Sequence, residues 1–115
     1  MHEIKHVEIA GVDGERLESF YSELLGWQIE RRQPGGFNYG HVEFNDALSA
    51  GIRHEPEGHA EIVVYVEVED VEASVESAVS LGATVRIPPM QAGDLFFALI
   101  QDPEGNPLGL TQKPA

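Results

Sequence analysis

The chain has 115 residues, no cysteine, and 20 acidic against 7 basic side chains, which gives a formal charge of −13 with histidine counted as neutral. A chain of this length makes one domain with its own hydrophobic core, and the absence of cysteine excludes thiolate chemistry, disulfides and cysteine-ligated zinc. The acidic excess argues against partners such as nucleic acid or an anionic membrane, because both require clustered Lys and Arg.

The N-terminus has no apolar segment behind a basic start, and the longest apolar runs have the length of strands. The sequence therefore predicts a cytoplasmic protein without a membrane span. The acidic charge has two interpretations, which are attraction of a cationic partner and adaptation to concentrated salt.

The first half of the chain reads as strand, helix and three further strands. An alternating strand from His6 is followed by Asp13, which is predicted to cap a helix that ends at Gly26. Further strands are predicted over 27–32, 37–46 and 49–54, with a glycine turn at 34–36. The helix carries an apolar stripe that is predicted to face the core, formed by Leu17, Phe20, Tyr21, Leu24 and Leu25.

The second half repeats this order at a shift of 56 to 57 residues. A strand from Val63 leads to Asp70, a helix and Gly82, and strands are predicted over 84–88, 95–102 and 108–112. Residues 88–91 are predicted to be a mobile rim or a rigid connector. The link over 54–59 is rich in Pro, Gly and charge, and places His54 and His59 in solvent.

These patterns predict an α+β fold made of two βαβββ modules, 1–57 and 58–115, within a single domain of residues 1–115. A module of about 57 residues is too small for independent stability, so the two are expected to share one core. The strands are expected to form a cupped mixed sheet around a cavity, with the helices on its outer face.

The repeat, the segment LESFYSELLGW (17–27) and the ending DPEGNPLGL (102–110) resemble the vicinal oxygen chelate superfamily, also called the glyoxalase, bleomycin-resistance and dioxygenase family. The resemblance implies paired modules around a cavity, and a homodimer for members this short. Catalytic members are lyases, isomerases or dioxygenases that use a divalent metal such as Zn, Ni, Mn or Fe as a Lewis acid.

Most of the metal-ligand positions implied by this resemblance carry residues whose side chains cannot bind a metal. The first-strand position of module one is His6, but its mate in module two is Val63. The last-strand positions are Gly51 and Gly109. A single imidazole holds a divalent ion poorly, so the sequence predicts a protein without a metal cofactor.

His6 and Glu8 lie two residues apart and therefore on the same face of one strand. They are either an acid/base pair, in which Glu8 raises the pKa of His6, or a structural pair. His41 and Glu43 repeat the spacing. If the two strands share a face, these four side chains converge, and they are the only group of N and O donors that could replace the missing metal ligands.

Five aromatic side chains are expected either to line a ligand pocket or to pack in the core. They are Trp27, Phe37, Tyr39, Phe96 and Phe97. The predicted ligand-binding set is His6, Glu8, Trp27, Tyr39, His41, Glu43 and Phe97. The leading hypothesis is a metal-free binder of a small apolar or cationic molecule. The alternatives are a metal-dependent lyase, isomerase or dioxygenase, and a metal-free enzyme with His6 or Glu8 as its proton-transfer group.

Overall fold

The computed structural model describes residues 1–33 and 38–115, so the predicted turn at 34–36 and Phe37 lie outside the described residues. The chain divides into two compact units. The first unit is His6–Ile62, and the second is Val63–Ala115 together with Met1–Lys5. The N-terminal residues belong with the second unit, where the Glu67 amide donates a hydrogen bond of 3.2 Å to the Glu3 carbonyl.

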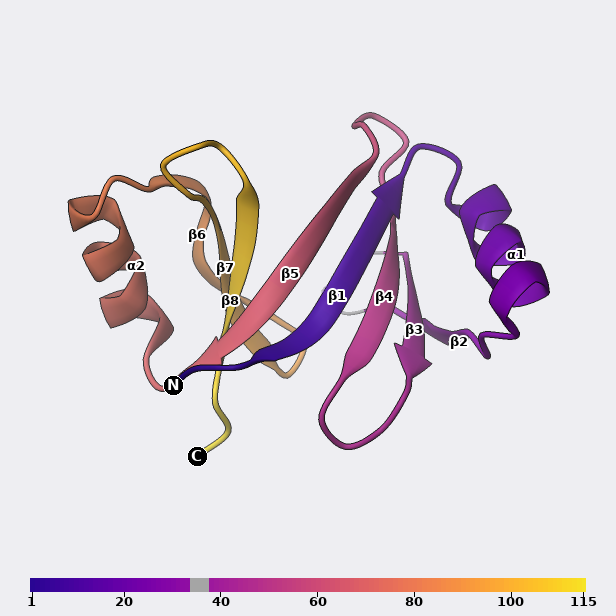
Figure 1. The fold of residues 1–115 in the computed structure, drawn as a ribbon, viewed down its shortest axis with the longest axis horizontal. Coiled ribbons are helices and arrows are strands. Elements are labelled where there is room, and N and C mark those ends of the chain that lie inside the picture. The colour runs from indigo at the N-terminus through magenta and orange to yellow at the C-terminus, as the bar shows by residue number, and fades with distance from the viewer. Residues whose placement is uncertain (34–37) are drawn as a thin grey trace. The chain divides into compact units, whose positions relative to one another are not determined.

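The first unit contains the predicted strand, helix and three strands (Figure 1). Its sheet has the order β2-β3-β4-β1, with β4 parallel to β1 and antiparallel to β3. β4 begins and ends where the sequence predicts, whereas β2 and β3 are shorter than predicted. The elements are β1 (Ile4–Gly11), α1 (Gly14–Leu25), β2 (Glu30–Arg32), β3 (Tyr39–Glu43) and β4 (Ser49–His54).

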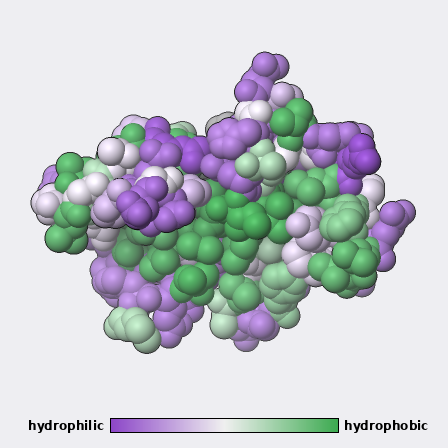
Figure 2. Space-filling model, turned by 45° about the horizontal axis from the view of Figure 1, so that its top comes forward, coloured by the Kyte–Doolittle hydropathy of each residue, from purple (hydrophilic) through white to green (hydrophobic). Residues whose placement is uncertain are grey.

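Helix α1 begins and ends as predicted, but its apolar stripe is not buried. Asp13 accepts a hydrogen bond of 3.1 Å from the Arg16 amide, and Gly26 ends the helix with a φ of 70°. Hydrophobic side chains reach the surface of the protein (green in Figure 2). On α1 they are Phe20, Leu24 and Leu25, which are 53%, 64% and 53% exposed. The prediction that these three pack in the core is wrong.

The second unit repeats the order, with the sheet order β5-β8-β7-β6 and β8 parallel to β5. Residues 88–91 are neither rim nor connector, because they belong to β6. The register between β6 and β7 shifts between Ile87 and Met90, where two prolines lack the amide hydrogens that a regular ladder needs. The elements are β5 (Glu61–Val68), α2 (Val71–Ser80), β6 (Thr84–Ala92), β7 (Leu95–Gln101) and β8 (Pro107–Gln112).

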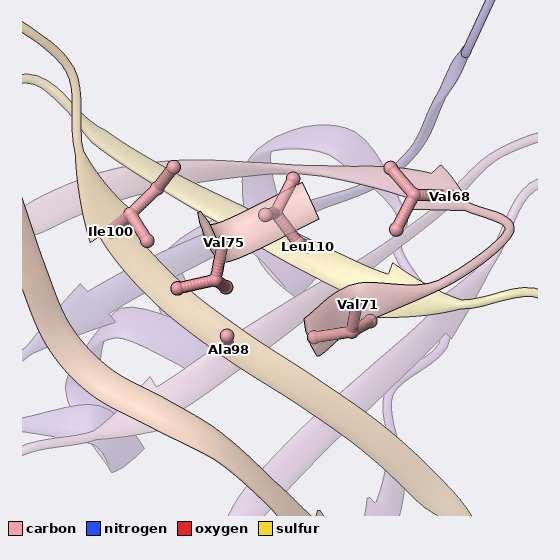
Figure 3. Close-up of a cluster of buried hydrophobic side chains, with 6 residues drawn as sticks. All are labelled: Val68, Val71, Val75, Ala98, Ile100 and Leu110. Carbon is pink, nitrogen blue, oxygen red and sulfur yellow. The ribbon is translucent and has the colours of Figure 1, made fainter. Parts of the chain in front are cut away.

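The core of the second unit lies between α2 and its sheet (Figure 3). Asp70 caps α2 by accepting from the Ala73 amide at 3.1 Å, so that Val71 and Val75 point at the strands. The cluster is completed by side chains from β5, β7 and β8, namely Val68, Ala98, Ile100 and Leu110. Both of these helix valines are buried, and their burial against the strands contributes to the stability of the unit.

The two units confirm the α+β class and the repeated βαβββ order, with one helix packed against each sheet. Among the described residues, no helix is long and apolar enough to cross a membrane.

Candidate functional site

One face of the sheet in the first unit is turned away from α1 and carries polar side chains. The opposite face, which is covered by α1, is identified by Gly11 and Gly40. A Cβ added at Gly11 would lie 2.9 Å from Leu17, and one added at Gly40 would lie 3.0 Å from Glu18, and both of these residues are on α1. Side chains alternate along strands, so the residues between point away from the helix. The strand registers bring together on this polar face His6, Glu8, Tyr39, His41, Glu43, Ser49, Gly51 and Arg53.

His6 lies at the centre of a hydrogen-bonded row across the polar face. Its Nδ1 is 2.7 Å from the Ser49 hydroxyl, and its Nε2 is 2.6 Å from the Tyr39 hydroxyl. The imidazole also stacks on that of His41, with ring centroids 6.0 Å apart and an angle of 11° between the planes. The ring is carried by β1, and β3 and β4 each contribute a group that fixes its orientation.

The pKa of His6 is lowered from its ordinary 6.5 to about 4, mainly by burial and to a smaller extent by the neighbouring His41. The ring is therefore neutral at physiological pH, with one nitrogen that donates and one that accepts. The pKa of His6 thus lies below its ordinary value, whereas the sequence predicts a pKa raised by Glu8.

Glu8 forms an ion pair with Arg53 instead. Only 5% of Glu8 is exposed, and its Oε1 lies 2.5 Å from Nη1 of Arg53. Nη2 of the same guanidinium lies 2.7 Å from the Glu61 carboxylate. Nε of Arg53 also lies 3.4 Å from the Glu55 carboxylate, so three carboxylates share one cation, which stabilises the charge of Glu8 in a buried position.

His41 and Glu43 form a second hydrogen-bonded pair, with 2.7 Å between Nε2 and Oε2. The hydrogen bond from His41 holds the pKa of Glu43 below its usual value. Of the four side chains predicted to converge, His6, His41 and Glu43 are therefore in contact, while Glu8 is held by Arg53.

Tyrosine rings fill the space at the two glycines of the implied metal-ligand positions. A Cβ added at Gly51 would lie 1.8 Å from the Tyr39 hydroxyl oxygen, and one at Gly109 would lie 2.1 Å from Cδ2 of Tyr65. Val63, the repeat mate of His6, is fully buried. Among the described residues, no group of three or more His, Asp or Glu side chains is arranged so that it could hold a metal ion.

The second unit is apolar where the first is polar. Its buried cluster of Val63, Tyr65 and Leu99 is packed against Ile87 and Phe97. Phe97, predicted to bind ligand, is half-buried beside this cluster. At the matching strand positions, Val63 and Leu99 stand where the first unit has the imidazoles of His6 and His41.

Trp27, also predicted to bind ligand, belongs to an aromatic cluster beside α1. It stacks on Tyr21 with ring centroids 4.9 Å apart and meets Phe44 edge to face at 5.3 Å. A shallow depression on this side is lined by Glu18, Ser19, Ser22, Trp27, Gln28 and Ile29. Trp27 is therefore positioned by α1 and not by the polar face.

Sequence reasoning missed Ser49, Arg53 and Glu61. The period-two spacing of Ser49, Gly51 and Arg53 was a usable signal, but only the pairing of β4 with β1 shows which face they share. His54 was also misjudged. Its side chain is 10% exposed and donates to Glu18, whereas His59 is 76% exposed as predicted.

Each of the two units packs a four-stranded mixed sheet against one helix, and this is the glyoxalase-like fold of the vicinal oxygen chelate superfamily. Residues 6–111 match the family model described as "Glyoxalase-like domain", and the chain belongs to that family.

Curated relatives include "Putative glyoxylase CFP32" from Mycobacterium bovis and from Mycobacterium tuberculosis, each 32% identical over 114 residues. The match covers 92% of this chain but 44% of each relative, so the chain spans less than half the length of these proteins.

Solved structures with a similar fold include hypothetical protein BH1468 from Bacillus halodurans, with a TM-score of 0.76, 14% identity and coverage of 99% of this chain and 96% of the other. A Streptomyces coelicolor methylmalonyl-CoA epimerase in complex with 2-nitronate-propionyl-CoA has a TM-score of 0.71, 17% identity and coverage of 97% of both chains. At these identities the likeness establishes the fold alone.

Proposed function

We propose that this chain is a small-molecule-binding domain of the glyoxalase-like family that works without a metal, and that its ligand lies on the polar face of the first unit. One observation carries the proposal. The Tyr39 side chain occupies the space above Gly51, where a metal ligand would be needed, and it is hydrogen-bonded to His6 at 2.6 Å.

Two features of His6 support independence from metal. Both ring nitrogens are engaged, by Ser49 at 2.7 Å and by Tyr39, whereas a metal requires an available nitrogen lone pair. The same contacts hold the ring and the two hydroxyls in place before a ligand arrives, which lowers the entropic cost of binding.

An apolar or cationic ligand fits the charge of the chain. The net charge of −13 disfavours anions at long range. The Tyr39 ring supplies an apolar surface, and Glu43, whose side chain is 67% exposed, supplies a local negative charge. Small aromatic amines and amidines combine both properties.

The test is a titration of chelator-treated protein with benzylamine, benzamidine and benzyl alcohol, followed by two-dimensional NMR. We expect saturable shifts of Ser49, Tyr39 and His41, unchanged in the presence of EDTA. Tyr39→Ala is expected to abolish them, while His59→Ala, at an exposed position in the link, serves as the matched control. The absence of any saturable shift would contradict the proposal.

A metal-dependent lyase, isomerase or dioxygenase is the second candidate, favoured by His6 at the first-strand ligand position and by the name of the mycobacterial relatives, which calls them glyoxylases. It requires stoichiometric Zn, Ni, Mn or Fe in protein purified without chelators, and loss of that metal in His6→Ala. Elemental analysis distinguishes the two candidates. The homodimer implied by the resemblance stays a prediction, which light scattering can test.

A further inference from the structure

We infer that His41, oriented by Glu43, is the hydrogen-bond acceptor of the polar face, and that the ligand presents a positively charged N–H group to it. The inference rests on the proposed function, because it identifies the contact through which that site recognises its ligand. It assigns different roles to two imidazoles that stack on each other.

The tautomer of His41 follows from its partner. An ionised carboxylate can only accept hydrogen bonds, so the 2.7 Å contact with Glu43 requires the hydrogen on Nε2 of His41. The hydrogen bond from His41 lowers the pKa of Glu43, which keeps the carboxylate ionised at neutral pH. With the hydrogen on Nε2, the neutral form of the ring carries its lone pair on Nδ1.

Nδ1 of His41 has no hydrogen bond within residues 1–33 and 38–115, and the side chain is 12% exposed. At His6, in contrast, both nitrogens are already in contact with hydroxyl groups. The stacked ring of His6 limits the rotation of His41, and Glu43 fixes its tautomer. A carboxylate that orients an imidazole in this way leaves the opposite nitrogen as a directed acceptor.

The surrounding charges favour a cationic donor. Glu43 is exposed beside the acceptor, and Glu30 lies opposite His41 in the register of β2 and β3. Arg32 is 3.4 Å from Glu30 and offsets that charge, so Glu43 supplies the remaining negative potential. An ammonium or amidinium group therefore gains a hydrogen bond and a Coulombic attraction, a hydroxyl gains only the hydrogen bond, and a carboxylate gains neither.

The test uses the full chain labelled with ¹⁵N and long-range NMR spectra of the histidine rings, with benzylamine, benzyl alcohol and benzoate as probes. We expect the spectra to show His41 protonated on Nε2 and bare on Nδ1. Benzylamine, an ammonium at neutral pH, should shift the Nδ1 resonance saturably. Benzyl alcohol should do so at higher concentration, and benzoate should not.

Glu43→Gln removes the charge and the constraint on the tautomer, and should weaken benzylamine binding about tenfold, since a charge-assisted contact is worth roughly one such factor. Glu69→Gln is the matched control, because it removes one charge at a position of the second unit that is 74% exposed and should leave the affinity unchanged.

Three results would overturn the inference. One is a hydrogen on Nδ1 of His41, another is equal weakening by Glu69→Gln, and the third is saturable shifts at Ser49 and Tyr39 without a change at His41. The last of these leaves the proposed function standing. If no probe shifts any residue of the polar face, the proposed function itself fails.

Discussion

The side chain of Tyr39 and the Cα of Gly51 are so close that no larger residue fits at position 51, where an added Cβ would lie 1.8 Å from the Tyr39 hydroxyl oxygen. We therefore expect Gly51→Ala to displace the ring, to break its 2.6 Å contact with His6, and to lower the free energy of unfolding by about 1–3 kcal/mol through overpacking. Urea denaturation measures the change in the free energy of unfolding, and the NMR signals of the His6 ring report the loss of its contact with Tyr39.

Gly109→Ala is the matched control, because a Cβ there would lie 2.1 Å from the Tyr65 ring in the second unit. It should destabilise the protein by a similar amount but leave the contact between Tyr39 and His6 intact. Unchanged His6 signals in Gly51→Ala would show that Tyr39 does not depend on the glycine.

Removal of one oxygen tests the hydrogen bond itself. Tyr39→Phe keeps the ring above Gly51 but leaves Nε2 of His6 without its hydroxyl partner, so we expect a loss of about 1 kcal/mol in the free energy of unfolding. Tyr21→Phe is the control, since its hydroxyl makes no hydrogen bond to the described residues and only its ring is packed, against Trp27. Equal stabilities of the two variants would contradict the assignment.

Arg53 should matter more to stability than an exposed arginine. Arg53→Met leaves the buried Glu8 and the partly buried Glu61 without their shared cation, at an expected cost of about 3–5 kcal/mol. Arg32→Met removes a guanidinium of similar length whose pair with Glu30 is exposed, and should cost about 0.5 kcal/mol or less. Denaturant titrations of both variants give the comparison, and similar losses would mean that Glu8 is stabilised by other groups.

The sequence predicts correctly those features that depend on a few neighbouring residues. The capping aspartates Asp13 and Asp70 and the helix end at Gly26 depend on a few neighbouring residues, and all three are confirmed. The repeat then predicted the order of the strands, because each module reads the same way.

Contacts between distant residues escaped prediction. Glu8 and Arg53 are 45 residues apart, and nothing in the spacing of His6 and Glu8 shows that the carboxylate turns to an arginine on β4. Likewise, the period of α1 identifies an apolar side but not whether a neighbour covers it, and Phe20 and Leu24 are exposed.

Two leucines of the chain differ in solvent exposure and are therefore expected to differ in their contribution to stability. Leu99 is 1% exposed, and Leu99→Ala should lower the free energy of unfolding by about 2–4 kcal/mol. Leu24 lies in the predicted core stripe but is 64% exposed, so Leu24→Ala should cost less than about 1 kcal/mol. Thermal or urea unfolding at low protein concentration measures both, and a large loss in Leu24→Ala would mean that α1 is covered in solution.

The buried imidazole of His6 should make stability depend on pH in one direction. Its pKa is about 4 in the folded protein, below the ordinary 6.5 that applies to the unfolded chain. Between these values the unfolded chain binds a proton that the folded protein does not. The free energy of unfolding therefore falls as the pH drops from about 6.5 to about 4, by roughly 3 kcal/mol at most, and His6 contributes no pH dependence above this window.

His6→Gln keeps a side chain that can hydrogen-bond but removes the titration. Carboxylates with lowered pKa values, such as Glu18 and Glu43, also cost stability as the pH falls, so the quantity to compare is the difference between wild type and variant at each pH. That difference should be constant above about pH 6.5 and should shift in favour of His6→Gln toward pH 4. His59→Gln, at an exposed position, should run parallel to wild type throughout, and parallel curves for His6→Gln would show that the ring is hydrated and titrates normally.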